Sequence, residues 1–165
     1  MDAGALVSVG LQPGAALGLL LGVSLRRGPW SLGVEAAAFL PSEHEQSYGT
    51  VSAHALYGSL VPCVHPGSRA VSADLCAVVS LGALFSDAKG VALSRPMTDR
   101  YTTVGPRVGV TFLISEVVGV RLSAEAAIPL PRVHLLIDDA GQSREAWASS
   151  SLGFIGGATV VLKPL

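Results

Sequence analysis

The sequence predicts an all-β fold, an antiparallel up-and-down closed β-barrel of about eight strands that spans a membrane. Apolar residues alternate with small or polar residues along most of the chain, and a period of two is typical of strands. Half of the 165 residues are apolar and only 14% are charged, whereas a soluble domain has about 25% charged residues. No uninterrupted apolar stretch reaches about 18 residues, which disfavours a membrane-spanning helix. We expect residues 1–165 to form one barrel domain.

The segment at residues 15–25 shows the alternation most clearly. Its odd positions are mostly large and apolar, while glycine and serine at the even positions make the other face small. An apolar segment of this length also suits the core of a signal peptide. Asp2, however, replaces the expected basic start, and Pro13-Gly14 interrupts the approach. We therefore expect a strand whose large apolar face contacts lipid.

Turn residues set the limits of the neighbouring strands. A first strand at residues 4–11 ends at the Pro13-Gly14 turn. The polar turn at 26–29 contains a glycine and a proline, and a third strand follows it at 30–40 with regular alternation. These segments predict two consecutive hairpins.

The fourth strand is less regular than the others. It is expected at residues 51–63, after a polar loop at 41–50. Its alternation is poor, so we expect either a bulge in it or a register other than the one assigned here, with Pro62 near the strand end. Regular alternation returns in the fifth strand, at 75–85.

The last three strands follow the same alternation and complete the barrel. Short and long connections alternate between consecutive strands. Ser115-Glu116 is the shortest connection, and the polar segments are longer. The expected elements are a loop at 86–99, strands at 100–114 and 118–130, a polar segment at 138–147 and a final strand at 149–162.

Charged residues are concentrated outside the expected strands. Of the 23 charged residues, 19 lie in expected turns, loops or strand ends. The four in strand interiors are Glu35, Arg107, Arg121 and Glu125, and all four lie on the face of small and polar residues. A soluble barrel would carry many charged residues on that face. In a membrane barrel it is the lumen, where Arg and Glu can pair. We predict a lumen network of these four residues; the alternative is that they lie at different heights and meet only water.

Two cysteines bracket a segment that looks like a loop, at residues 64–75. Cys63 and Cys76 lie at the ends of expected neighbouring strands, where thiols can meet in disulfide geometry. We favour a disulfide, which persists in oxidising compartments. Two buried free cysteines are the alternative. The spacing matches no zinc motif.

The order of connections resembles a known family. Short turns at 26–29 and 115–116 alternate with three longer polar loops, and Arg and Glu occupy the lumen face. This pattern is similar to the small outer-membrane barrels of the OmpA/OmpX type. The resemblance implies an outer-membrane location, both termini and the cysteine segment in the periplasm, and the three longer loops at the cell surface.

The expected function follows from this class of protein. We expect a structural, anchoring or surface-interaction role without an open pore, because side chains fill an eight-stranded barrel. Expected partners are outer-membrane lipid and a surface ligand or protein at the loops around Glu43, Lys89 and Arg144. We expect a monomer without a cofactor, a metal or an enzymatic activity. Nucleic acid is not expected, since the net charge is −1 and no basic run is present.

Two alternatives remain open from the sequence. The first is a soluble barrel of the lipocalin kind, with the large apolar face turned inward around a lipophilic ligand. The second is a lipid-modifying enzyme at the membrane rim. His44, His54 and His134 have acidic neighbours or lie near strand ends, but no nucleophile motif such as G-x-S-x-G accompanies them.

Overall fold

The computed structural model describes residues 1–46, 49–66, 71–89, 97–132, 134–139 and 142–162. Strands make up the regular structure of these residues, and no helix among them is long and apolar enough to cross a membrane. The strands are β1 (Asp2–Val9), β2 (Ala16–Arg27), β3 (Trp30–Phe39), β4 (Ser42–Gln46), β5 (Gly49–Val64), β6 (Val71–Lys89), β7 (Met97–Leu113), β8 (Val118–Pro129), β9 (His134–Asp139), β10 (Gln142–Ala148) and β11 (Gly153–Leu162).

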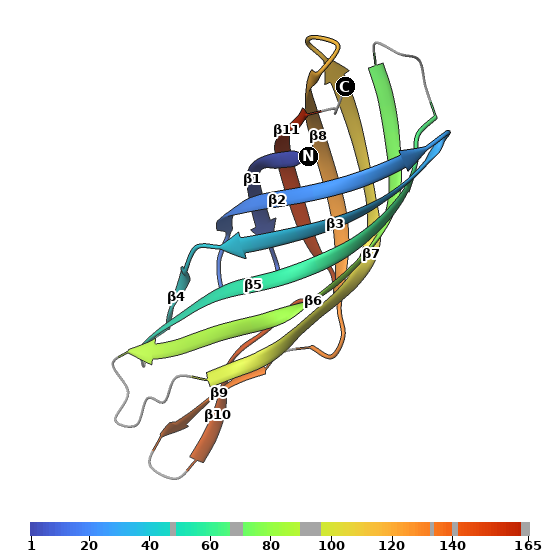
Figure 1. The fold of residues 1–165 in the computed structure, drawn as a ribbon. Coiled ribbons are helices and arrows are strands. Elements are labelled where there is room, and N and C mark those ends of the chain that lie inside the picture. Colours follow the sequence, from blue (N-terminus) through green and yellow to red (C-terminus); the bar gives the residue numbers. More distant parts are fainter. Residues whose placement is uncertain (47–48, 67–70, 90–96, 133, 140–141, 163–165) are drawn as a thin grey trace.

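Eight of these strands close into an antiparallel barrel. Hydrogen bonds join β3, β2, β1, β11, β8, β7, β6 and β5 in that order, and β3 also pairs with β5, which closes the ring. Figure 1 shows the tilted strands around the closed barrel. The predicted fold class, an up-and-down barrel of about eight strands, is confirmed. Closure gives each of the eight strands a hydrogen-bonded neighbour on both sides.

The two ends of the barrel differ. Both termini lie at one end, together with the tight connections before β3 and before β8; we call this the terminal end. At the opposite end, β4 pairs with the start of β5, and β9 and β10 form a separate two-stranded sheet. These elements project beyond the barrel (Figure 1), and we call this the hairpin end.

The three expected polar loops contain more strand than predicted. Residues 41–50 include β4, β6 and β7 extend into the segment 86–99, and β9 and β10 take up much of 138–147. Strands outside a membrane need no apolar face, because backbone pairing alone satisfies their polar groups. Alternation therefore gave no signal there. The last barrel strand is correspondingly shorter than predicted and begins at Gly153.

Two expectations about β5 and its surroundings were wrong. Its pairing with β3 and with β6 keeps one register, so the expected bulge is absent. Pro62 is exposed and lies near the strand end, two residues before Val64, as expected. The alternation is weak because its lumen-facing residues are themselves apolar, filling the interior. The segment 64–75 also contains more strand than expected, since β5 continues to Val64 and β6 begins at Val71.

Side chains fill the lumen. An apolar cluster lies toward the hairpin end, where Tyr57 stacks between Phe39 and Tyr101 with ring centroids 5.9 and 5.1 Å apart. Leu84, also in this cluster, is fully buried. The charged side chains that line the lumen lie farther toward the terminal end.

Candidate functional site: the apolar exterior and the charged lumen

The outer surface of the barrel is covered with exposed apolar side chains. Along β2 the exposed fractions of Leu19, Leu21 and Leu25 are 67%, 65% and 85%. Exposed apolar patches on soluble monomers are limited to a few hundred Å², so a surface of this kind favours a lipid environment. Every barrel strand contributes to this band; its members include Val7, Leu17, Leu19, Leu21, Val34, Leu56, Leu60, Leu75, Leu81, Val108, Phe112, Leu122, Phe154 and Val160.

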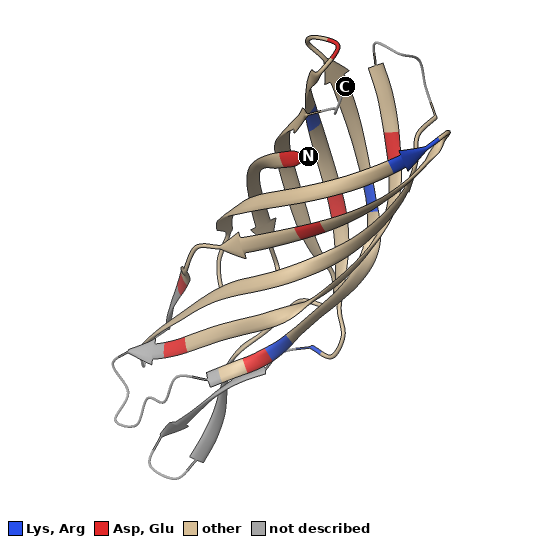
Figure 2. Ribbon diagram, viewed as in Figure 1, with Lys and Arg blue, Asp and Glu red and all other residues tan. Residues whose placement is uncertain are grey.

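Charged residues are sparse along the middle of the strands and more frequent toward the barrel ends (Figure 2). The charges that do lie along the strands include Glu35 on β3 and Glu125 on β8, which are buried, and Arg107 on β7, which is 13% exposed. The same strands therefore present apolar groups outside and charged groups inside, as a membrane barrel requires.

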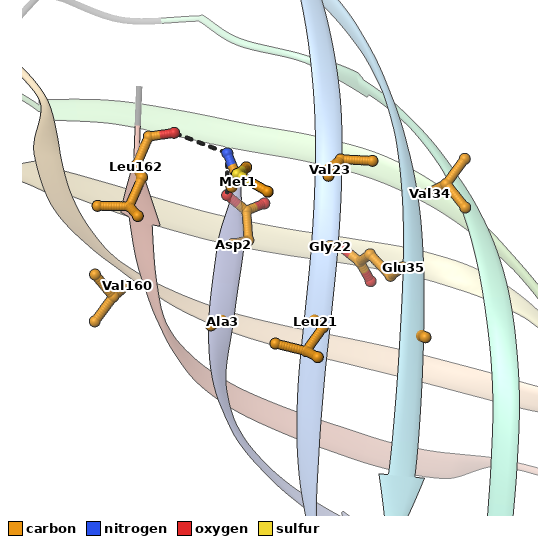
Figure 3. A pocket seen from close by; sticks show the side chains of 11 residues that line it. Met1, Asp2, Ala3, Leu21, Gly22, Val23, Val34, Glu35, Val160 and Leu162 are labelled. Carbon is orange, nitrogen blue, oxygen red and sulfur yellow. Dashed lines mark hydrogen bonds and ion pairs between the residues drawn. The ribbon is translucent and has the colours of Figure 1, made fainter. Parts of the chain in front are cut away.

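Small residues make a shallow apolar groove in the exterior near the terminal end. It has a volume of about 480 Å³ and extends over β1, β2, β3 and β11. Ala3 lies between the larger Leu21 and Val160 (Figure 3), which are its partners in the adjacent strands. Gly22 carries no side chain here, and a Cβ would come within 3.0 Å of Cγ of Glu35. The groove belongs to the apolar band, with the lumen carboxylates beneath it.

Arg107 forms the centre of one lumen cluster. Its Nη1 donates to both carboxylate oxygens of Glu35 at 2.8 and 2.7 Å, and its Nε donates to Oε2 of Glu125 at 2.9 Å. Arg107 and Glu125 are directly paired on β7 and β8, while Glu35 reaches them from β3. We call these three residues the central cluster. One guanidinium serves two carboxylates, so the cluster carries a net charge of −1 when all three are ionised.

Arg121 belongs to a different cluster. Its Nε lies 2.9 Å from Oδ2 of Asp74, and its Nη1 lies 3.2 Å from Oδ2 of Asp2. Thr111 donates its hydroxyl to the same Oδ2 of Asp74 at 3.0 Å. We call Asp2, Asp74 and Arg121 the terminal cluster. The structure thus brings together three of the four residues of the predicted network and places Arg121 with other partners.

Sequence reasoning missed both carboxylates of the terminal cluster. Asp2 was assigned to the chain start and Asp74 to the cysteine loop, although both are buried lumen residues in β1 and β6. A signal for Asp74 exists, because it lies two residues before Cys76 and so shares the face of that residue. Continuing the alternation backward from Cys76 would have found it.

A histidine and a serine extend the terminal cluster. Nδ1 of His65 lies 2.6 Å from Oδ1 of Asp74, and Nε2 of His65 lies 2.6 Å from Oγ of Ser31. The predicted disulfide between Cys63 and Cys76 is confirmed and lies directly beside this group. Cys63 and Cys76 are cross-strand partners. His65 and Asp74 occupy the next pair of positions on the same face.

Little space remains between the two clusters. A lumen cavity bordered by Asp2, Glu35, Arg107 and Arg121 has a volume of about 10 Å³. A cavity of this size holds about one water molecule. It offers no room for a lipophilic ligand of the kind that a lipocalin binds.

The histidines of the proposed rim enzyme do not form a site in the described residues. His54 is exposed and stacks on Phe85 with ring centroids 5.0 Å apart. The side chains of His44 and His134 lie outside the part of the chain that the structure describes. Where side chains are described, no group of three or more His, Cys, Asp and Glu has the arrangement of a metal site.

Two solved barrels have the same fold. The crystal structure of Neisserial surface protein A (NspA) aligns over 99% of this chain and 94% of that chain, with 13% identity and a TM-score of 0.63. The Yersinia pestis attachment invasion locus protein Ail, in complex with the heparin analogue sucrose octasulfate, aligns over 98% of this chain and 94% of that chain, with 12% identity and a TM-score of 0.57. No family model and no curated protein matches the sequence. The resemblance to small outer-membrane barrels is confirmed at the level of the fold.

Proposed function

We propose that this protein is an integral outer-membrane β-barrel with a structural, anchoring or surface-interaction role. The observation that carries the proposal is the band of exposed apolar side chains around a closed barrel whose lumen holds the charges. The soluble alternative required the leucines to face inward, and Leu19 and Leu21 face outward instead. With lipid outside and a filled lumen inside, the barrel anchors the chain without an open pore.

The hairpin end is the part that we expect to meet a partner. In the orientation implied by the resemblance, the termini lie in the periplasm and the hairpin end faces the cell exterior. There β4 and the β9–β10 sheet extend beyond the barrel. The described charged side chains at this end are of both signs, which favours a protein or another mixed polar surface over a polyanion such as the one bound to Ail. They include Glu43, Asp87, Asp99, Arg100 and Arg132.

Refolding the chain from urea into detergent micelles tests the membrane assignment. We expect a strand-rich monomer whose electrophoretic mobility changes on boiling and which precipitates without detergent. A stable strand-rich monomer in plain buffer would contradict the proposal.

A pair of substitutions on one face of β2 provides the matched test in lipid. Leu19 lies in the interior of the strand and Leu25 near its terminal end, and both are exposed. Arginine on the lipid face costs about 2–4 kcal/mol at the bilayer midplane and about 0–1 kcal/mol near the interface. We therefore expect Leu19→Arg to lower the free energy of unfolding from vesicles more than Leu25→Arg does. Equal effects would argue against lipid contact.

A further inference from the structure

We propose that Ser31, His65 and Asp74 form an acyl-transfer site at the terminal end, which hydrolyses short carboxylic esters that approach from the water. Three strands supply or position these residues: Ser31 is on β3, Asp74 is on β6, and His65 directly follows β5. The Oγ–Nε2 and Nδ1–Oδ1 distances are both 2.6 Å. A nucleophile, a base and an acidic residue that orients the base are recognised by this geometry on unrelated folds.

The hydrogen bonds fix which nitrogen of His65 acts as the base. Oδ2 of Asp74 accepts from Thr111 and forms an ion pair with Arg121. An ionised carboxylate can only accept, so Nδ1 of neutral His65 carries the proton. Its Nε2 is then a lone pair directed at the hydroxyl of Ser31. This is the tautomer that can take a proton from a serine nucleophile.

The surrounding framework holds these groups in place. The disulfide joins Cys63 and Cys76, each two residues from His65 or Asp74 on the same face. The backbone N–H of His65 donates to the carbonyl oxygen of Pro29 at 2.8 Å, which ties the residue after β5 to the turn before β3. Catalytic groups on strands that are cross-linked in this way keep their geometry without a substrate.

Access and charge near Ser31 define the class of substrate. The side chain of Ser31 is half-buried at the terminal end, whereas His65 and Asp74 are buried. Arg26 is the cross-strand partner of Ser31 and shares its face. Its exposed Nε donates to the carbonyl oxygen of Gly28 at 3.2 Å, so the site has a positive charge at its mouth, which favours a substrate whose carbonyl oxygen becomes negative during the reaction. Farther inside, the packed residues Val61 and Val78 leave little room, which favours a short acyl group.

The reaction balances with water as the second reactant. Oγ of Ser31 bonds to the ester carbonyl carbon while its proton passes to Nε2 of His65. The ester C–O bond then breaks, and the departing alcohol takes that proton. Water attacks the acyl-serine with His65 again accepting the proton, and the C–Oγ bond breaks to release the carboxylic acid and restore Ser31.

Covalent labelling of the refolded protein in detergent tests the site. A fluorophosphonate probe forms an Oγ–P bond with an activated serine and releases fluoride, and peptide mass spectrometry locates the label. We expect the label on Ser31, together with hydrolysis of p-nitrophenyl acetate that exceeds hydrolysis of p-nitrophenyl decanoate. Ser31→Ala and His65→Gln are expected to lower the hydrolysis rate by about 100-fold or more.

Matched variants separate a catalytic role from a structural one. Ser24→Ala removes a nearby serine of β2 for which no histidine contact is described, and it is expected to leave labelling unchanged. Asp2 and Asp74 both pair with Arg121, but Asp74 is the one that contacts His65. As a positioning residue, Asp74 is expected to affect kcat and not KM when changed to Asn, while Asp2→Asn leaves both constants unchanged.

Boiled and unboiled samples of every variant are compared by electrophoresis, which reports folding of the barrel independently of catalysis. Folded wild-type protein without a label on Ser31, or with equal hydrolysis in Ser31→Ala, would overturn the acyl-transfer site and leave the membrane-barrel proposal standing. Protein that folds in plain buffer and is still labelled at Ser31 would overturn the membrane-barrel proposal and leave the acyl-transfer site standing.

Discussion

The central and terminal clusters both neutralise buried carboxylates in the lumen, but with different sets of partners. Each places one arginine between two buried carboxylates, Arg107 in the first and Arg121 in the second. The ion pairs described for Glu35 and Glu125 all involve Arg107. In the terminal cluster Asp74 has further partners in Thr111 and His65.

The arginine of the central cluster is also more deeply buried than the arginine of the terminal cluster. The side chain of Arg107 is 13% exposed and that of Arg121 is 20% exposed, nearer the water at the terminal end. The comparison indicates that the central cluster depends on a single cation, whereas the terminal cluster distributes its charge over several groups. We therefore propose that the central cluster has a structural role and stiffens the barrel. The terminal cluster also supplies Asp74 to the proposed acyl-transfer site.

The largest effect is expected for Arg107→Met. It leaves two buried carboxylates without their cation, and removing one partner of a buried pair costs about 3–5 kcal/mol. Urea unfolding from lipid vesicles, followed by tryptophan fluorescence, measures the loss. Arg107→Lys keeps the charge but has one ammonium group in place of the separate nitrogens that contact Glu35 and Glu125, so its loss should be smaller than that of Arg107→Met. A cost for Arg107→Met below about 1 kcal/mol would remove the distinction between the clusters.

The second effect concerns the disulfide, which braces the terminal cluster. Replacing Cys63 and Cys76 with Ala removes a cross-link that closes a short loop of sequence separation 13. Loop-closure entropy predicts a loss of about 3 kcal/mol. Reduction with a thiol should reproduce the loss in wild-type protein and leave the double variant unchanged. If reduction has no effect on the free energy of unfolding, the disulfide does not stabilise the terminal cluster, and the ion pairs and hydrogen bonds of the cluster are sufficient.

The contrast between the clusters also explains how much the sequence could predict. The outward leucines of β2 and the inward Glu35 and Arg107 follow from alternation within single strands, and the structure has them on those sides. Alternation cannot say at which height of the barrel a residue lies. That depends on the register between strands, which pairs Arg107 with Glu125 and Arg121 with Thr111.

The part of the site that was missed lies where alternation is hardest to follow. His65 and Asp74 flank a hairpin connection rich in polar and small residues, and a charge there is most often a solvated loop residue. Ser31 is the second residue of the expected strand at 30–40, and nothing in the sequence around it marks a nucleophile. Their meeting depends on β3, β5 and β6 lying side by side, a fact of the closed barrel and not of any one segment.

A smaller effect is expected for Arg121→Met. Asp74 keeps the hydroxyl of Thr111 and the imidazole of His65, and the side chain of Arg121 is itself 20% exposed. Losing a hydrogen bond to a charged group costs about 1.5–3 kcal/mol, so the loss should fall below that of Arg107→Met in the same unfolding assay. An equal or larger loss would mean that the extra partners do not compensate, and it would reverse the order of the two clusters.

The coupling between the clusters gives the smallest expected effect. Asp2, Glu35 and both arginines border one cavity of about 10 Å³, so the two clusters share an environment. After either single substitution the other arginine still offsets part of the negative charge; in Arg107→Met/Arg121→Met neither does. The double variant should therefore lose more stability than the two single losses combined, by about 0.5 kcal/mol or more. Additive losses would show that the two clusters do not interact. The stabilising effect of each arginine would then come from the carboxylates of its own cluster alone.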